Sequence, residues 1–598
     1  MSRSYSQLSV RDTSYIYVSN TVMYVEDEIN LGTTAAETDP AIYLRNEAQL
    51  IQGSGTTGNS GRGRLSVEQE GTVHNYAYNY WASPVGHVDV VANGNSNFRA
   101  DAVFFEPGTI LTPTPAGFTG SYDGVASPLQ IASYWLWAYN PGTAYSDWDH
   151  LQSTGELPAG YGFTMKGSTG SPFQAYDFRG KPNSGTITAE ILDGQSTLVG
   201  NPYPSALDAL KYIHDPVNAT LLNGTLYFWE QDQTVMSHNL TSYKGGYATY
   251  TIDASGSTET FVPATFDTYN GDGSLNTTGA SSTTGKRVKQ FIPIAQGFMV
   301  VGESGIPTTS VTTFKNEHRV FYRESGEASE FFKVQDAATS LDSSNTTYNP
   351  EAQSTIVYGT NGFQVLPADI KRFRLNVDFN DTYTRQMVQT FLDTATPAFD
   401  YGLEIKNINA GGNEVYFKND TETAELIAQA FAFDDTLKIP LHINLTEDKA
   451  IRIRISDIQN FDDDQNIYIH DIENDIYYNL RAQNFDVNLS AGLYDDAFEI
   501  TFKDTDETLT VDTFEDSNFN VFQNNNQSTL TISNPKLLSI TSFKLIDMSG
   551  KQVLYKGNLK NESRYEFNTS NLSDGVYMAM TTLSTNETLN KKVVISNK

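Results

Sequence analysis

The sequence predicts an all-β protein of several domains. Short runs of β-branched and aromatic residues recur along the chain, separated by glycine, proline, asparagine and aspartate, which is the pattern of strands joined by turns. The 598 residues include 34 Tyr, 33 Phe and 44 Gly, a mix typical of folded β structure. One core rarely serves so long a chain, so two to four domains are expected.

Composition narrows the classes of function. The chain has no cysteine, which excludes disulfides and thiolate metal sites. With 39 basic against 71 acidic side chains, its net charge of -32 disfavours nucleic acid as a partner. No apolar run is long enough to predict a transmembrane helix. The start, from Met1 to Ser6, has no apolar core of a signal peptide, so we expect a removed leader or a C-terminal piece of a longer protein.

Residues 1–310 are expected to form a β region rich in aromatic residues and glycine. Within it, Ile16 to Val25 resembles Ile42 to Ile51 at an offset of 26 residues. Repeats of this kind predict the stacked turns of a short β-solenoid over residues 15–75, because each turn must bury its apolar face on the next. A β-meander is the alternative.

The middle of this region carries one helix signal and one candidate binding surface. Ser205 to Asp208 looks like a capping box, which predicts a helix start at Ser205. If residues 134–137 form a strand, Trp135 and Trp137 share one face of it. Such rings can stack on a sugar, so this pair is our candidate platform for a glycan ligand, although core burial is the more common role of any single aromatic residue.

Residues 311–503 predict a β-sandwich. The segments Phe373 to Val377, Ile439 to Leu445 and Ala450 to Ile455 alternate apolar and polar residues, which places one side of each strand in a core and the other in water. Residues 504–518 are acidic and polar, and we expect them to form an extended linker.

Residues 519–598 predict a small, seven-stranded, immunoglobulin-like β-sandwich. Seven short runs, from Phe519 to Val521 at the start to Lys592 to Ile595 at the end, are separated by turn-formers such as Asn534-Pro535.

A combination of motifs inside this module is more specific than a sandwich. Asp547, Gly550 and Lys551 lie in one turn, Leu572 precedes Gly575, Val576 and Tyr577, and Lys591 and Lys592 begin the last run. Together they resemble the type A C-terminal sorting domain of Bacteroidetes type IX secretion cargo. The resemblance covers the whole module and implies delivery to the cell surface or the medium.

The resemblance also implies partners. The type IX translocon and its outer-membrane barrel shuttle, of the PorV type, are expected to bind residues 519–598. Segments further upstream, such as Tyr78 to Gly86 and Leu198 to Pro204, are similar to segments of flavobacterial surface proteins that carry this domain. That group of proteins includes adhesin-like members.

Two segments predict weak calcium sites. Asn270 and Asp272 are spaced like oxygen ligands of a calcium loop, but the glycine and glutamate that an EF-hand needs are absent. Asp462 and Asp464 lie in an acidic run that is equally typical of a solvated turn. Ca²⁺ is the one cofactor these patterns suggest.

No catalytic motif stands out. The eight histidines are scattered, without a His-Glu-x-x-His pair, and neither a Gly-x-Ser-x-Gly elbow nor a Walker loop is present. A glycoside hydrolase needs only two carboxylates in a cleft, which leave no motif. Two hypotheses therefore stay open: an adhesin-like or structural surface protein, and a polysaccharide-binding protein or hydrolase.

Overall fold

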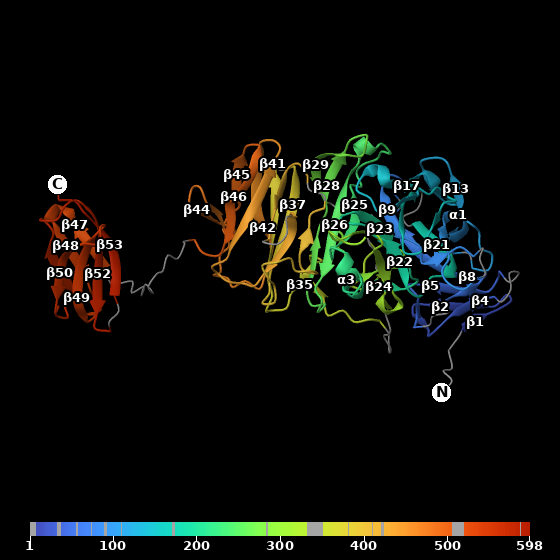
Figure 1. Ribbon diagram of the computed structural model, residues 1–598, viewed down its shortest axis with the longest axis horizontal. Helices are drawn as coiled ribbons and strands as arrows, with labels where there is room; N and C mark the ends of the chain where they lie inside the picture. The colour runs from blue at the N-terminus through green and yellow to red at the C-terminus, as the bar shows by residue number, and fades with distance from the viewer. Residues whose placement is uncertain are drawn as a thin grey trace, which may run out of the picture. The chain divides into compact units, whose positions relative to one another are not determined.

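The computed structural model describes residues 8–32, 38–54, 58–72, 74–88, 92–108, 110–169, 174–282, 285–331, 351–380, 382–408, 411–419, 424–504, 520–585 and 588–597. Two compact units make up the chain, Met1–Asp504 and Thr505–Lys598. The linker predicted at 504–518 lies, after Asp504, outside the described residues. Strands dominate both units (Figure 1), which confirms the all-β prediction. Among the described residues, no helix is long and apolar enough to cross a membrane.

The first unit begins with a short β-solenoid. Ile16 pairs with Ile42, so the 26-residue offset of the sequence repeat equals the offset between paired strands. Equivalent strands of successive turns pair in parallel, whereas a meander pairs neighbours antiparallel, so the solenoid alternative is confirmed. Its three sheets contain β1 (Leu8–Val10), β4 (Ile29–Leu31) and β7 (Ser60–Gly61); β2 (Tyr15–Ser19), β5 (Ala41–Arg45) and β8 (Arg64–Gly71); β3 (Val22–Val25) and β6 (Gln49–Gln52).

Antiparallel sheets and one mixed sheet follow the solenoid. β8 pairs with β21 (Gln174–Pro182), which also holds β10 (Val85–Gly86) and β12 (Phe104–Phe105). Next to it lies a four-stranded sheet in the order β17 (Trp148–His150), β16 (Trp137–Tyr139), β19 (Gly162–Lys166) and β9 (Tyr78–Ala82). Smaller elements are β11 (Phe98–Arg99) with β18 (Glu156–Leu157), α1 (Ala100–Val103), and a sheet of β13 (Gly117–Thr119), β15 (Leu129–Ala132), β14 (Gly124–Ala126) and β20 (Ser168–Thr169).

A seven-stranded sheet forms the centre of the first unit. Its order is β23 (Ser196–Gly200), β31 (Gly297–Val301), β25 (Leu226–Gln231), β26 (Lys244–Ile252), β28 (Thr265–Tyr269) and β29 (Leu275–Ser281), with β27 (Glu259–Val262) paired to β26. Two short helices, α2 (Ala209–Ile213) and α3 (Asn218–Leu221), pack on its apolar core.

The helix start predicted at Ser205 is wrong by four residues. Ala206–Asp208 forms strand β24, because it pairs with β30 (Phe291–Ile292) and β33 (Arg319–Val320). Asp208 is the residue that caps α2: its side chain accepts from the backbone N–H of Leu210 at 3.1 Å.

The region after residue 370 is a two-sheet sandwich, as predicted. One sheet has the order β38 (Ile405–Lys406), β40 (Leu426–Phe431), β37 (Tyr383–Phe391), β36 (Lys371–Phe379), β42 (Lys449–Gln459) and β45 (Phe485–Leu489). The other has β39 (Glu414–Tyr416), β41 (Lys438–Leu445), β46 (Gly492–Thr501), β43 (Tyr468–Asp471) and β44 (Ile476–Asn479). Their inward residues, such as Phe373, Leu375 and Leu441, form one core.

The strand at the predicted 310/311 boundary belongs to the preceding sheets. β32 (Val311–Phe314) pairs antiparallel with β22 (Ile187–Glu190). The sandwich core spans residues 373–502. The domain limits themselves stay predictions.

Two buried arginines join the sandwich to the central sheet. β27 pairs with β26 along one edge only, so its outer carbonyls need other donors. Arg372 donates to the Glu259 carbonyl at 2.9 Å, and Arg374 donates to the Phe261 carbonyl at 2.7 Å. Arg374 also lies over the Phe363 ring, 3.9 Å from its centroid. Burial lowers the pKa of Arg372 to about 10, so it stays charged at neutral pH.

Arg372→Met tests this joint. The variant leaves the Glu259 carbonyl and the hydroxyls of Thr260 and Thr390 without their guanidinium donor. We expect the free energy of unfolding, measured with urea, to fall by about 1–3 kcal/mol for each buried acceptor left unpaired. Arg452→Met is the control, since its ion pair with Asp486 is exposed and is expected to contribute about 1 kcal/mol or less. Equal losses in the two variants would contradict the role given to Arg372.

The second unit is a sandwich of seven antiparallel strands, as predicted. One sheet contains β47 (Asn520–Asn524), β48 (Thr529–Ser533) and β51 (Arg564–Asn568); the other contains β50 (Gln552–Gly557), β49 (Ile540–Asp547), β52 (Gly575–Leu583) and β53 (Thr588–Ile595). Phe543 and Phe567 stack across the core with ring centroids 4.9 Å apart.

Candidate functional site

The sheet of β17, β16, β19 and β9 has two different faces. Successive side chains of a strand point to opposite sides. Phe163 and Met165 of β19 enter the apolar core, while Thr164 and Lys166 point the other way. The strand register places further rings on the side of Lys166, and we name this side the aromatic face; it holds Tyr78, Tyr80, Trp137, Tyr139, Trp148 and His150.

Residues of the central sheet partly cover the aromatic face. Trp229 of β25 stacks parallel to Tyr80 at 6.2 Å and 9°, and Tyr247 of β26 bonds its hydroxyl to that of Tyr80 at 2.9 Å. The cover is incomplete, because Trp137, Trp148 and His150 stay half-buried. Bulky rings therefore line a surface that solvent reaches.

The open end of the face is a row of rings in contact. Trp137 stacks on His150 with centroids 4.1 Å apart and 15° between the planes. Tyr134, 40% exposed, packs edge-on against both. Two buried ring nitrogens, Nε2 of His150 and Nε1 of Trp229, have no hydrogen-bond partner among the described residues. Buried polar atoms are nearly always paired, with ordered water where the protein supplies no partner.

A buried lysine lies beneath this row. The Nζ of Lys166 is 3.4 Å from the ring centroid of Trp135 and also faces Tyr78 at 4.6 Å. It donates to the Tyr243 hydroxyl and lies 3.2 Å from Nδ1 of His238. Burial lowers the pKa of Lys166 to about 6.

An aspartate fixes the orientation of the histidine. Nε2 of His238 lies 3.0 Å from Oδ1 of Asp123. A carboxylate only accepts, so Nε2 carries the proton and Nδ1 is the acceptor for Lys166. The His238 ring stacks on Trp135 at 5.0 Å and 22°. Asp123, His238 and Lys166 thus hold Trp135 in place under the exposed rings.

The two predicted platform residues lie in different elements. Trp135 ends a 3-10 helix, Ser133–Trp135, whereas Trp137 begins β16. The expected strand over 134–137 is therefore wrong, because the 3-10 turn breaks the alternation. Trp135 is only 5% exposed and donates from Nε1 to the Tyr122 carbonyl at 2.7 Å. Trp137 alone of the pair reaches the surface, next to Tyr134.

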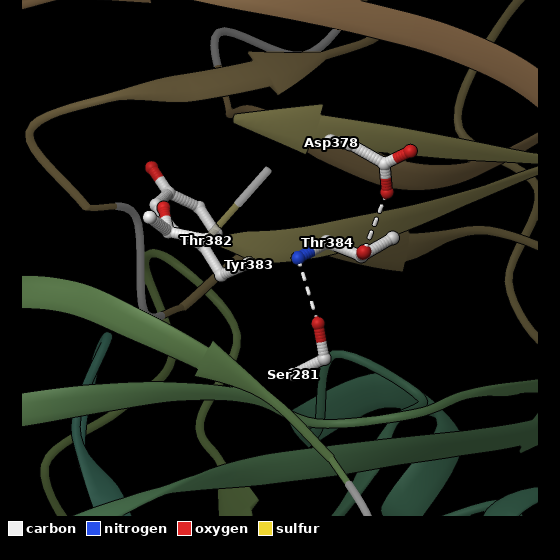
Figure 2. Close-up of a pocket in the computed structure, with 5 residues that line it drawn as sticks. All are labelled: Ser281, Asp378, Thr382, Tyr383 and Thr384. Carbon is white, nitrogen blue, oxygen red and sulfur yellow. Dashed lines mark hydrogen bonds between the residues drawn. The ribbon is translucent and has the colours of Figure 1, made fainter. Parts of the chain in front are cut away.

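A separate polar pocket lies between β29 and the hairpin of β36 and β37. It has a volume of about 260 Å³ and is lined by Ser281, Asp378, Thr382, Tyr383 and Thr384. Figure 2 shows Thr384 bonded to both sides of it: its hydroxyl donates to Asp378 at 2.6 Å, and its N–H donates to Ser281 at 2.8 Å. Asp378 is also paired with Arg454 at 2.8 Å. One carboxylate that is already paired does not make the acid–base couple of a hydrolase.

Of the predicted calcium residues, Asn270 and Asp272 bond within their own loop. Asp272 accepts from the N–H and the hydroxyl of Ser274, and Asn270 donates to the same hydroxyl. Asp462 lies 3.9 Å from the Nζ of Lys371. Calcium at Asn270, Asp272, Asp462 and Asp464 stays a prediction.

Another cluster has ligand types that suit a metal. Asp215, Glu317 and His318 bring one ligand atom each within 4.8 Å of one another. Lys315 already donates to Asp215 at 2.5 Å, and His318 lies 3.1 Å from the same oxygen. The lysine charge supplies what a cation would, so we read the cluster as a structural ion pair.

The sorting-motif residues of the second unit shape its turns. Asp547 accepts from the N–H groups of Ser549 and Lys551, and Gly550 has a φ of 83° that favours glycine. Tyr577 donates to the Ser573 carbonyl at 2.7 Å. The remaining members are Leu572, which packs on the core, Gly575 and Val576 at the start of β52, and Lys591 and Lys592, which are exposed on β53.

Comparisons with known proteins assign both parts of the chain. The model of the domain of unknown function DUF8693 matches residues 119–502, and that of the secretion system C-terminal sorting domain matches residues 520–596. The chain belongs to the DUF8693 family. The sorting domain makes this DUF8693 protein cargo of the type IX secretion system, which secretes it to the cell surface.

Other comparisons add little. No curated protein matches the chain. A biofilm-associated protein BSP domain is similar at 8% identity over 89% of this chain and 90% of that one, with a TM-score of 0.10. The extracellular domain of a one component system from B. thetaiotaomicron is similar at 10% identity over 77% and 68%, also at 0.10. These TM-scores carry no argument about fold or function.

The DUF8693 match covers most of the aromatic face. Trp137, Lys166 and His238 lie inside it, whereas Tyr78 and Tyr80 precede it. The sequence did not predict the cluster of Lys166, His238 and Asp123, because these residues are far apart in the chain and form no local motif.

Lys166→Met tests the buried amine. Between pH 6 and pH 10.5 the unfolded chain holds a proton on Lys166 that the folded chain lacks, so wild type gains stability as the pH rises through this range. Met binds no proton. We therefore expect the Tm advantage of the variant over wild type to be largest near pH 6 and to shrink toward pH 9, measured by scanning calorimetry. The control is Lys211→Met, at an exposed lysine of α2, whose Tm difference from wild type is expected to stay the same at every pH. If the Tm difference of Lys166→Met were also independent of pH, a buried neutral amine would be contradicted.

Proposed function

We propose that this protein is an adhesin-like surface protein that holds polysaccharide against its aromatic face. The observation that carries the proposal is the row of Tyr134, Trp137 and His150, whose rings touch one another and remain open to solvent. Secretion to the cell surface places this row where extracellular glycans are found.

The chemistry of the row fits a sugar. An aromatic ring offers a flat apolar surface that complements the C–H face of a pyranose, and its polar edge bonds to hydroxyl groups. Stacking with hydrogen bonds at the edge is the usual construction of a site that binds a polar ligand with flat apolar faces.

Charge narrows the class of polysaccharide. The chain carries a net charge of -32, which repels uronic acid and sulfated polymers. Neutral polysaccharides are therefore the expected ligands.

Trp137→Ala tests the proposal. Removing this ring removes the centre of the row, and we expect at least a tenfold weaker affinity for a neutral β-glucan or xyloglucan in affinity gel electrophoresis. Tyr17→Ala is the matched control, because Tyr17 is 49% exposed on the solenoid, away from the aromatic face.

The same gels separate the alternatives. Retention of wild type by alginate but by no neutral polymer would contradict the charge argument. Release of reducing sugar during the incubation would show that the protein is a glycoside hydrolase and not only a polysaccharide-binding protein. Equal retardation of the Trp137 variant and wild type would overturn the aromatic face as the binding site.

We also propose that the type IX translocon and a barrel shuttle of the PorV type bind the second unit. The sorting-domain match and the compact fold of this unit support the proposal. Deleting residues 519–598 in a bacterium with a type IX system is expected to leave the protein in the periplasm, detected by fractionation and immunoblot. Surface display of the shortened chain would count against it.

A further inference from the structure

The four-stranded sheet of the second unit exposes an apolar outer face. Phe543, Leu545 and Ala579 point into the core, so their neighbours along β49 and β52 point outward. Cross-strand pairing places these outward residues side by side: Ile546 lies beside Met578, and Val576 beside Val594. We name this set the outer face; it comprises Lys544, Ile546, Gln552, Tyr555, Val576, Met578, Met580, Asn590, Lys592 and Val594.

The exposure of this face is high. Val594 is 57% exposed, Tyr555 56% and Met578 41%. An antiparallel sheet with one buried face usually turns polar residues to water. The three-stranded sheet of the same sandwich follows that rule on β51, where Arg564, Glu566 and Asn568 are exposed. The apolar residues are therefore concentrated on one side of the unit.

Two lysines lie within the apolar set. Lys544 pairs across the sheet with Met580, and Lys592 pairs with Met578. Neither lysine forms an ion pair with any residue that the structure describes. The outer face thus combines apolar contacts with two positive charges in a chain whose net charge is -32.

We propose that the outer face is the surface by which the secretion system recognises this sorting domain, and that the partner presents an apolar patch with carboxylates. This inference rests on the proposed role of the second unit in export. Contiguous exposed apolar residues mark interaction sites. The two lysines are positively charged and lie among the apolar residues, so they favour a partner whose contact surface carries carboxylates.

The central experiment places charge on the outer face. Met578→Asp with Val594→Asp is built in the full chain and produced in a bacterium with a type IX system. Both side chains are exposed, so the core is left intact. We expect the fraction of protein outside the cell to fall at least tenfold, measured by fractionation and immunoblot. Lys544→Glu with Lys592→Glu, which changes only charge, is expected to lower it in the same direction.

The control is Phe522→Asp. Phe522 is 42% exposed on β47, in the opposite sheet, so it matches Met578 in exposure and in chemical change. Secretion of this variant is expected to stay within twofold of wild type. Thermal unfolding of each purified full chain checks that the second unit stays folded.

The outcomes separate this inference from the proposal it rests on. If the outer-face variants are secreted normally while deletion of 519–598 blocks export, the recognition surface is elsewhere and the inference is overturned. If the deletion variant is also exported, the export role itself fails. If wild type is a dimer in sedimentation experiments and the outer-face variant is a monomer with normal secretion, the face binds a second copy and the inference is overturned.

Discussion

Alternation along one strand determines both the core and the candidate site of the first unit. In β19, Phe163 and Met165 enter the apolar core while Thr164 and Lys166 line the aromatic face. A shift of one residue in the register would place the lysine in the core and the phenylalanine beneath the exposed rings, so the core packing enforces the register. The positions of the rings on this face therefore depend on the packing of the core behind it.

The buried arginines show how the central sheet and the sandwich are joined without backbone hydrogen bonds between paired strands. Among the described residues, β27 pairs only with β26, and an edge without a paired strand can attract other chains. Arg372 and Arg374 fill the positions of a neighbouring strand by donating to the carbonyls of Glu259 and Phe261. The stacking of Arg374 on Phe363 and the hydrogen bonds of Arg372 to two threonines offset part of the cost of burying the two charges.

The parts of the fold that could be predicted from the sequence are those that short sequence patterns determine. The solenoid was predicted from a sequence repeat at an offset of 26 residues, and the paired residues Ile16 and Ile42 are separated by that offset. The second unit was predicted from its short alternating runs and its sorting motif. Trp135 and Trp137 were placed on one strand because a 3-10 turn of Tyr and Trp has no distinct pattern. The contacts of His238 with Lys166 and with Asp123 span 72 and 115 positions, so only the tertiary fold brings these residues together.

Two buried glutamates have strongly raised pKa values for structural reasons. A hydrolase separates the pKa values of two accessible carboxyls. Glu259 and Glu404 have pKa values raised to about 7 by burial, but both are enclosed in hydrogen bonds. Glu259 accepts from Tyr250 and Tyr358, and Glu404 accepts from the backbone of Ala430. Their raised pKa values therefore reflect burial inside the fold, where hydrogen bonds from tyrosine hydroxyls and the backbone satisfy the carboxyl groups.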